Sequence, residues 1–231
     1  MLGIIGAMEV EVSLLKDKMN NVTVKKKASM EFFQGTLNEQ EVVVVRSGIG
    51  KVNAAVCAQI LVDDYKVDTI INTGIAGSLK NDINIGDIVL STDALQHDVD
   101  AAGFGYEVGI IPQMEQSVFN ADPKLRELAK ACCQEVNKDI AVFEGRIVSG
   151  DQFISDKEKK QWISNQFQGY CTEMEGAAIA QCAYLNQIPF LIVRAISDKA
   201  DDSAVMDYPE FERQAVKHSV NLIDAICQKL N

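Results

Sequence analysis

Runs of consecutive apolar residues alternate along the chain with segments in which apolar residues recur at helical spacing. Such uninterrupted runs are typical of strands in a sheet covered on both faces. The predicted strands are residues 1–6, 31–48 (a hairpin turning near Asn38), 67–74, 86–95, 141–150 and 189–197. The predicted helices are residues 8–19, 51–65, 121–137, 155–166, 173–186 and 208–230. The pattern predicts an α/β protein with helices flanking a central sheet.

The pattern also indicates how the chain is organised. No internal repeat, low-complexity segment or long Pro/Gly/Ser linker divides it, so we expect one domain over residues 1–231. Asp122 and Ser155 precede two of the predicted helices and are expected to cap them. The irregular stretch 96–120 is the longest predicted loop, and long loops are often lids or interfaces.

Composition narrows the classes of partner. The net charge of −11 argues against nucleic acid or an anionic membrane, and residues 25–27, all lysine, are predicted to be a solvated loop. No apolar run approaches the roughly 20 residues of a membrane span, and the N-terminus reaches Glu9 without a basic leader. We therefore expect a cytoplasmic protein whose six cysteines are reduced and mostly buried.

The histidines give little support for metal or triad chemistry. His97 and His218 are the only two, and the stretch HDVD that begins at His97 has no cysteine or second histidine near it. A polar loop is the better interpretation of HDVD, so we predict no metal and no cofactor. Two histidines also supply a Ser-His-Asp triad poorly.

The first predicted helix carries two acidic residues within the stretch GAMEVEV that begins at Gly6. On a helical wheel Glu9 lies outside the apolar arc, where favourable interaction with the helix dipole, about 0.3–1 kcal/mol, explains it. Glu11 lies inside that arc, where an unpaired charge is costly. The pattern leaves Glu11 open between a functional carboxylate and a second dipole charge. The glycine spacing matches neither a dinucleotide-binding turn nor a P-loop.

Two further carboxylates are predicted to point inward. In the helix expected over 173–186, Glu175 faces the apolar side while Glu173 faces the opposite way. Asp198 ends a buried strand, and ligands of α/β sheets lie beyond the carboxyl ends of strands. Asp198 is a candidate acid, with a helix or loop cap as the alternative. Together Glu11, Glu175 and Asp198 suggest acid–base cleavage of a glycosidic bond, in which a cationic sugar develops.

Six motifs occur together in the order and spacing of one known family. They are GIIGAMEVEV, SGIGKVNAA, INTGIAG, IVSGDQFI, EMEGAAIA and VRAISD. The chain resembles bacterial 5′-methylthioadenosine/S-adenosylhomocysteine nucleosidases, of the nucleoside phosphorylase-like superfamily, over essentially its whole length. The resemblance implies a three-layer α/β/α sandwich with a mixed central sheet, and a homodimer that needs no metal or cofactor. It implies hydrolysis of these nucleosides, and of 5′-deoxyadenosine or related 5′-substituted adenosines, to adenine and the thioribose. This reaction serves methionine salvage and removes methyl-cycle by-products.

The resemblance also implies roles for single residues. Glu11 matches the glutamate that activates the attacking water, and Asp198 matches the aspartate that donates a proton toward adenine N7. Glu175, with Met174 beside it, matches the glutamate that holds the ribose hydroxyls. Arg194 is similar to a cation that lies behind the residues contacting the substrate.

The remaining matches concern the two ends of the nucleoside. Phe153 matches a ring stacked on adenine, Ile154 a residue whose backbone reads the adenine edge, and Gly77 a loop residue lining the nucleoside. Apolar positions near the 5′-alkylthio group are matched by Met8, Ile49 and Tyr208. Residues that complete this pocket from the partner subunit are matched by Phe104 and Pro112, which would give the loop 96–120 its purpose.

The sequence departs from the family pattern at a few positions. Ile75 stands where many members carry serine, which could remove a polar contact near Asp198, and Ser78 stands where many have glycine. Tyr208 replaces the commoner phenylalanine. Two other functions remain as alternatives: a purine nucleoside phosphorylase of the same superfamily, and a nucleoside-binding protein without turnover.

Overall fold

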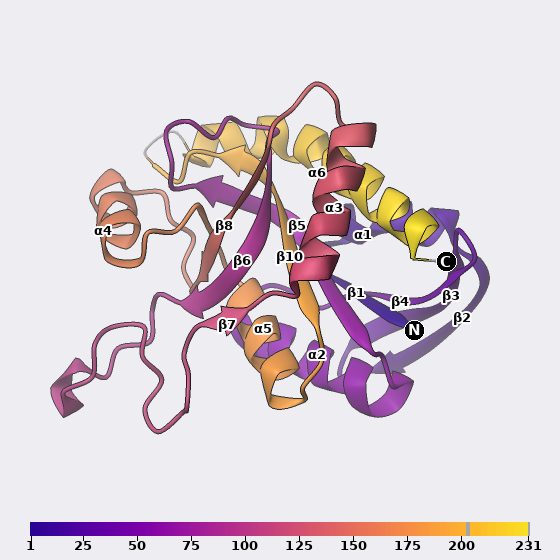
Figure 1. Ribbon diagram of the computed structural model, residues 1–231, viewed down its shortest axis with the longest axis horizontal. Helices are drawn as coiled ribbons and strands as arrows, with labels where there is room; N and C mark the ends of the chain where they lie inside the picture. Colours follow the sequence, from indigo (N-terminus) through magenta and orange to yellow (C-terminus); the bar gives the residue numbers. More distant parts are fainter. Residues whose placement is uncertain (202–203, 231) are drawn as a thin grey trace.

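A central sheet with helices on both faces forms the protein, in a computed structural model that describes residues 1–201 and 204–230 (Figure 1). The strands are β1 (Leu2–Gly6), β2 (Asn20–Lys27), β3 (Met30–Leu37), β4 (Gln40–Arg46), β5 (Thr69–Ser78), β6 (Ile88–Gln96), β7 (Phe119–Asn120), β8 (Val142–Ser149), β9 (Cys171–Glu173) and β10 (Phe190–Asp198). The helices are α1 (Glu9–Lys18), α2 (Lys51–Tyr65), α3 (Pro123–Val136), α4 (Lys157–Phe167), α5 (Gly176–Leu185) and α6 (Ala204–Lys229), with a 3₁₀ turn η1 (Ala102–Phe104).

The sheet is mixed, in the order β10-β6-β8-β9-β5-β1-β4-β3-β2, with β7 paired to β6. Strand β10 also pairs with β5, so five strands close on themselves. In the centre, Ile4 of β1 lies between Val44 and Ile71 in parallel register, and all three are fully buried. Helices α1, α3 and α6 pack on one face, and α2 and α5 on the other (Figure 1). The predicted α/β/α sandwich with a mixed sheet is therefore confirmed.

One long strand was not expected. Residues of β2, with the three lysines at its end, pair with β3 at the edge of the sheet, and all eight are exposed. The prediction of a loop was wrong here because exposed edge strands lack an apolar face that alternation could reveal. Lysines on such an edge hinder pairing with another chain.

The start of α5 also differs from the prediction. The helix expected from residue 173 begins at Gly176, because residues 171–173 form the short strand β9 between β8 and β5. Elsewhere Asp122 caps α3 as expected, accepting from Leu125 N over 2.8 Å. Helix α4 is capped by Asp156 rather than by Ser155.

The topology brings the candidate motifs together. Strands β1, β5 and β10 are parallel neighbours, so Gly6, Ser78 and Asp198 end at the same edge of the sheet. That edge is the one at which α/β sheets hold ligands. The expectation of one domain over residues 1–231 stays a prediction, which the single sheet through the described chain supports.

Candidate active site

A cavity of about 500 Å³ lies at this edge of the sheet, a size typical of small-molecule sites. Eight of the predicted site residues line it: Met8, Glu11, Ile49, Gly77, Phe153, Met174, Glu175 and Asp198. The rest of the lining comes from Ala7, Ile75, Ala76, Thr172, Glu173 and Ser197. The cavity thus joins residues from α1, β5, β9 and β10 with residues of the connecting segments, such as Ala7 directly after β1.

Glu11 reaches into the cavity from the first turn of α1 and is 5% exposed. Its Oε2 accepts from the N–H groups of Ala7 (2.7 Å) and Met8 (2.9 Å), and its Oε1 accepts from Ile75 N (3.1 Å). These bonds occupy three of the roughly four acceptor positions of a carboxylate, which leaves one for a water molecule. Glu11 therefore both caps its helix and presents a carboxyl group to the cavity.

Burial sets the proton affinity of Glu11. Desolvation raises the pKa of its carboxyl above the ordinary value, while the nearby Arg194 guanidinium and the three backbone N–H groups oppose that rise. A carboxylate with a raised pKa is a stronger base near neutral pH. The close fit depends on Gly74, where an added Cβ would lie 2.6 Å from Glu11 Oε1.

Asp198 occupies an irregular point at the end of β10. The register of β10 against β5 shifts between Ile196 and Asp198, so the side chain enters the cavity rather than continuing the strand pattern. Its Oδ1 accepts from Ala200 N and its Oδ2 from Ser197 Oγ, both over 2.8 Å. Gly77 lies opposite, and a Cβ there would approach Asp198 Oδ1 to 2.7 Å.

Glu175 stands at the N-cap position of α5 and is 6% exposed. Its Oε1 accepts from Gly50 N over 2.8 Å, which connects it to the start of α2. Burial, together with repulsion from Glu173, raises the pKa of Glu175 to about 8, although Arg194 opposes the shift. Glu175 lines the cavity, but the helical face from which its inward direction was predicted does not exist there, since Glu175 lies before the helix.

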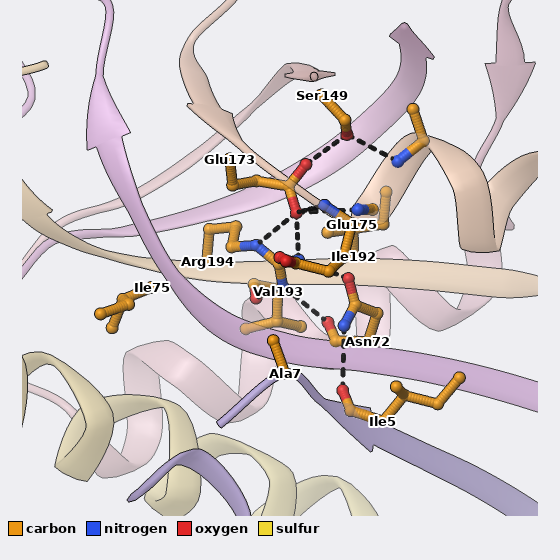
Figure 2. Close-up of polar contacts among 12 residues, drawn as sticks. Ile5, Ala7, Asn72, Ile75, Ser149, Glu173, Glu175, Ile192, Val193 and Arg194 are labelled. Atoms are coloured by element: carbon orange, nitrogen blue, oxygen red, sulfur yellow. Dashed lines mark hydrogen bonds and ion pairs between the residues drawn. The ribbon is translucent and has the colours of Figure 1, made fainter. Parts of the chain in front are cut away.

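A buried polar network supports this carboxylate (Figure 2). Arg194 lies between Glu173 and Asn72. Its Nη2 donates to a Glu173 carboxylate oxygen and to the side-chain oxygen of Asn72, and its Nε donates to Glu173 over 3.2 Å. Glu173 also accepts from Ser149 Oγ and from Gly176 N (2.8 Å). Removing one member of a buried ion pair costs about 3–5 kcal/mol. The network thus fixes the backbone from which Glu175 projects.

Five predicted residues lie elsewhere. Arg194 is fully buried behind the cavity, and Ile154 is buried beside its wall without lining it. Phe104 is 88% exposed in η1, and Pro112 is exposed in the same loop, which extends away from the sheet (Figure 1). Tyr208 falls within α6, but its side chain lies outside the described residues.

Sequence reasoning missed Glu173 and Ser197 as members of the site. Glu173 belongs to the EMEGAAIA motif. A short strand predicted before the helix would have given this side chain an inward direction. Ser197 precedes Asp198, and its hydroxyl donates to the aspartate. Asp198 therefore keeps a hydroxyl partner although Ile75 replaces the serine of many family members.

The site offers no evident metal position. Among the described residues, no group of three or more His, Cys, Asp and Glu side chains has an arrangement that could hold a metal ion. His97, from the HDVD stretch that was predicted to be a polar loop, lies in a turn and is buried, and its neighbour Asp98 pairs with Lys51 over 2.6 Å. The carboxyl groups that line the cavity can perform acid–base chemistry.

The raised pKa of Glu175 predicts a pH-dependent stability. A folded-state pKa of about 8 against an ordinary 4.5 means that the folded protein holds this proton more tightly. The stability that the protonated Glu175 side chain contributes to the free energy of unfolding is therefore fully present below pH 4.5 and is lost as the pH rises through 8. We expect Glu175→Gln to flatten the decline in stability between pH 5 and 8 in denaturant titrations. Glu31→Gln, at an exposed position, serves as control, and an unchanged slope in Glu175→Gln would refute the assignment.

Comparison with known proteins identifies the class of protein. The sequence model of the phosphorylase superfamily matches residues 1–228. A 5′-methylthioadenosine/S-adenosylhomocysteine nucleosidase of Bacillus cereus (strain B4264) is 42% identical over 230 residues, covering 99% of each chain. The crystal structure of the corresponding nucleosidase of Neisseria meningitidis, in complex with methylthio-immucillin-A, is 38% identical with a TM-score of 0.94, covering 98% of each chain.

A third relative carries a different name. The solved futalosine hydrolase of Helicobacter pylori strain 26695 is 30% identical with a TM-score of 0.92, covering 97% of this chain and 96% of that one. The chain belongs to the 5′-methylthioadenosine/S-adenosylhomocysteine nucleosidase family of the phosphorylase superfamily. None of the helices in the described residues is long and apolar enough to span a membrane.

Proposed function

We propose that the protein hydrolyses the N-glycosidic bond of 5′-methylthioadenosine and S-adenosylhomocysteine, releasing adenine and the 5′-thioribose. The observation that carries this proposal is the convergence of Glu11, Glu175 and Asp198, from three separate elements, on one cavity. Cleavage of a glycosidic bond needs a base, an acid and a negative environment for the developing sugar cation. The reaction serves methionine salvage and removes a by-product of methyl transfer.

Glu11 and Asp198 carry the proton transfers in this proposal. Glu11 accepts a proton from the attacking water through its remaining acceptor position, while the three backbone N–H groups hold it in place. Asp198 donates a proton toward N7 of adenine, so that the base leaves as a neutral molecule. The bond that breaks is C1′–N9, and the bond that forms joins C1′ to the water oxygen.

The other residues bind and orient the nucleoside. Glu175 holds the ribose hydroxyls. A cation that develops on the ribosyl ring favours the ionised form of this carboxyl, whose pKa is raised to about 8, so its attraction grows toward the transition state. Phe153, which is half exposed at the cavity, stacks on adenine, and the Ile154 backbone beside it reads the base edge. Gly77 lines the nucleoside opposite Asp198. Arg194 acts from behind, by positioning Glu173.

The 5′-alkylthio group fits the apolar end of the cavity. Met8 and Ile49 line that end, and we assign Tyr208 to the same slot. An apolar slot of this kind tolerates related groups, so 5′-deoxyadenosine and other 5′-substituted adenosines are included among the substrates. The existence of a relative named for futalosine supports a range of substrates on this fold.

The two alternatives fit the site less well. A phosphorylase needs phosphate near the position of Glu11, and two like charges about 4 Å apart repel by about 4 kcal/mol at an effective dielectric of 20. A binding protein without turnover has no need for a buried base and a buried acid in one cavity. Adenine release from methylthioadenosine and adenosylhomocysteine tests the proposal directly. Binding of both nucleosides without adenine release would overturn it.

We also propose a homodimer in which Phe104 and Pro112 complete the partner's 5′ slot. Both are exposed on the loop that extends from the sheet, and an 88% exposed phenylalanine is well placed for contact with another chain. Ile49 of the slot is itself 54% exposed, so the slot has room for a covering residue.

The six cysteines are buried and free, which supports a reducing, cytoplasmic location.

The dimer proposal predicts the effect of Phe104→Ala. Loss of the ring should raise KM for methylthioadenosine about tenfold, because burying such a ring against a substrate is worth more than 1 kcal/mol. Steady-state kinetics measures KM, and sedimentation measures whether the variant is still a dimer. Leu185→Ala, at an exposed apolar residue of α5, is the matched control. An unchanged KM in Phe104→Ala would exclude the shared slot.

A further inference from the structure

A second cavity, of about 390 Å³, adjoins the candidate active site. The two cavities share Ala7, Met8 and Ile49 as lining residues, so the apolar slot forms the boundary between them. Glu9, Arg46, Gly48 and Asn53 are among the other residues that line the second cavity. No step of the proposed reaction uses this cavity.

The second cavity differs from the first in its charge. Arg46, at the end of β4, is a cation on its wall, and Glu9 is the anion beside it. Glu9 is held by Lys16, whose Nζ donates to its two oxygens over 2.8 and 3.1 Å. Arg46 Nε lies 3.8 Å from Glu9 Oε2, an ion pair too long for a direct hydrogen bond. Arg46 is therefore oriented by Glu9 while its guanidinium can still bind a carboxylate in bidentate fashion.

The chemical difference between the two proposed substrates matches this arrangement. Both carry a thioether at the 5′ position, which suits the wall of Met8 and Ile49. Only adenosylhomocysteine continues into an amino-acid group, which bears a carboxylate and an ammonium close together. A wall that presents Arg46 next to Glu9 offers one partner for each charge. Methylthioadenosine ends at its methyl group and needs neither.

We propose that the second cavity is the subsite for the amino-acid tail of adenosylhomocysteine, with Arg46 binding the carboxylate and Glu9 facing the ammonium. The proposal rests on the proposed function and extends it to substrate choice. It gives Glu9 a role beyond that of a charge at the start of a helix. It also assigns selectivity to the end of β4 and the first residue of α1, neither of which lines the catalytic cavity.

The local backbone supports a stable subsite. Asn53 Nδ2 donates to Ile49 O over 2.6 Å, which holds the loop at the boundary between the cavities. In the same loop Gly48 has a φ of 86°, a conformation that favours glycine, and a Cβ there would lie 3.3 Å from Asn53 Nδ2. Lys16, with a side chain only 9% exposed, anchors Glu9.

The test compares two substrates in one variant. In Arg46→Gln we expect kcat/KM for adenosylhomocysteine to fall about tenfold, mainly through KM, relative to that for methylthioadenosine, which is the effect of losing one charge-assisted contact at a partly exposed site. Arg46→Lys keeps the charge without the bidentate fork, so it should recover part of the loss. Lys27→Gln, at an exposed ion pair elsewhere on the sheet, should leave the ratio unchanged.

The outcomes separate this proposal from the proposed function. An unchanged ratio in Arg46→Gln, or an equal loss on both substrates, would overturn the tail subsite. A wild-type protein that releases no adenine from methylthioadenosine would overturn the proposed function itself. A smaller loss on adenosylhomocysteine in Glu9→Gln than in Arg46→Gln, again measured as the ratio, would support the division of charges. Equal ratios in Glu9→Gln and the wild type would remove Glu9 from the subsite.

Discussion

Glu11→Gln is expected to lower kcat for adenine release by about 10²- to 10⁴-fold, the usual contribution of a general base. The amide is nearly isosteric with the carboxylate but cannot take a proton from water. It also offers one oxygen to three backbone donors where the carboxylate offers two. With the oxygen placed toward Ala7 and Met8, the N–H of Ile75 loses its acceptor, which costs about 1–3 kcal/mol of stability.

The variant therefore distinguishes a catalytic role from a structural one, because a structural role would impair turnover and substrate binding together. Steady-state kinetics should show the loss in kcat, while calorimetry should show that methylthioadenosine still binds. Asp17→Asn, on the exposed side of the same helix α1, changes an acid without touching the cavity and should keep full activity. Turnover at the wild-type rate in Glu11→Gln would remove Glu11 from the mechanism.

Asp198→Asn is expected to lower kcat on the same scale, for a different reason. An asparagine at this position keeps an oxygen that accepts from Ala200 N. The Ser197 hydroxyl can accept a hydrogen bond from the new amide NH₂ group, so the local structure should survive. What is lost is the proton that adenine needs in order to leave. The expected loss is again about 10²- to 10⁴-fold. Asp122→Asn, which preserves the cap of α3 far from the cavity, is the matched control.

A change of leaving group distinguishes an acid from a binding residue at position 198. A 4-nitrophenyl riboside releases 4-nitrophenolate, a stable anion that needs no proton in order to leave. Asp198→Asn should therefore lose much less activity on that substrate than on methylthioadenosine, whereas Glu11→Gln should lose activity on both. Equal losses of Asp198→Asn on the two substrates would contradict the acid role.

The apolar pattern of the sequence was sufficient for the central architecture. Buried strands such as β1, β5 and β10 contain continuous apolar runs because both of their faces are covered, and they overlap the predicted ranges, although β5 continues to Ser78 beyond the predicted end at residue 74. The helical wheel likewise placed Glu11 inward and Glu9 outward, as the structure has them, with Glu11 5% exposed. Periodicity predicts such features because burial depends there on local geometry alone.

Short and exposed elements were beyond that reasoning. Strand β9 has three residues, too few for a period, so Glu173 and Glu175 were assigned to a helix. Their true arrangement follows from pairing with β5 and β8, which are distant in sequence. Contact between Arg194 and Asn72 depends on another long-range pairing, that of β10 with β5. The partner contact of Phe104 involves a second chain, so it stays a proposal.

In the proposed reaction water, rather than phosphate, attacks the nucleoside beside Glu11. The most direct measurement is adenine release from methylthioadenosine with and without inorganic phosphate, with identification of the sugar product. We predict the same rate in both conditions and free 5-methylthioribose as the product. Adenine release that requires phosphate and yields 5-methylthioribose 1-phosphate would contradict the account.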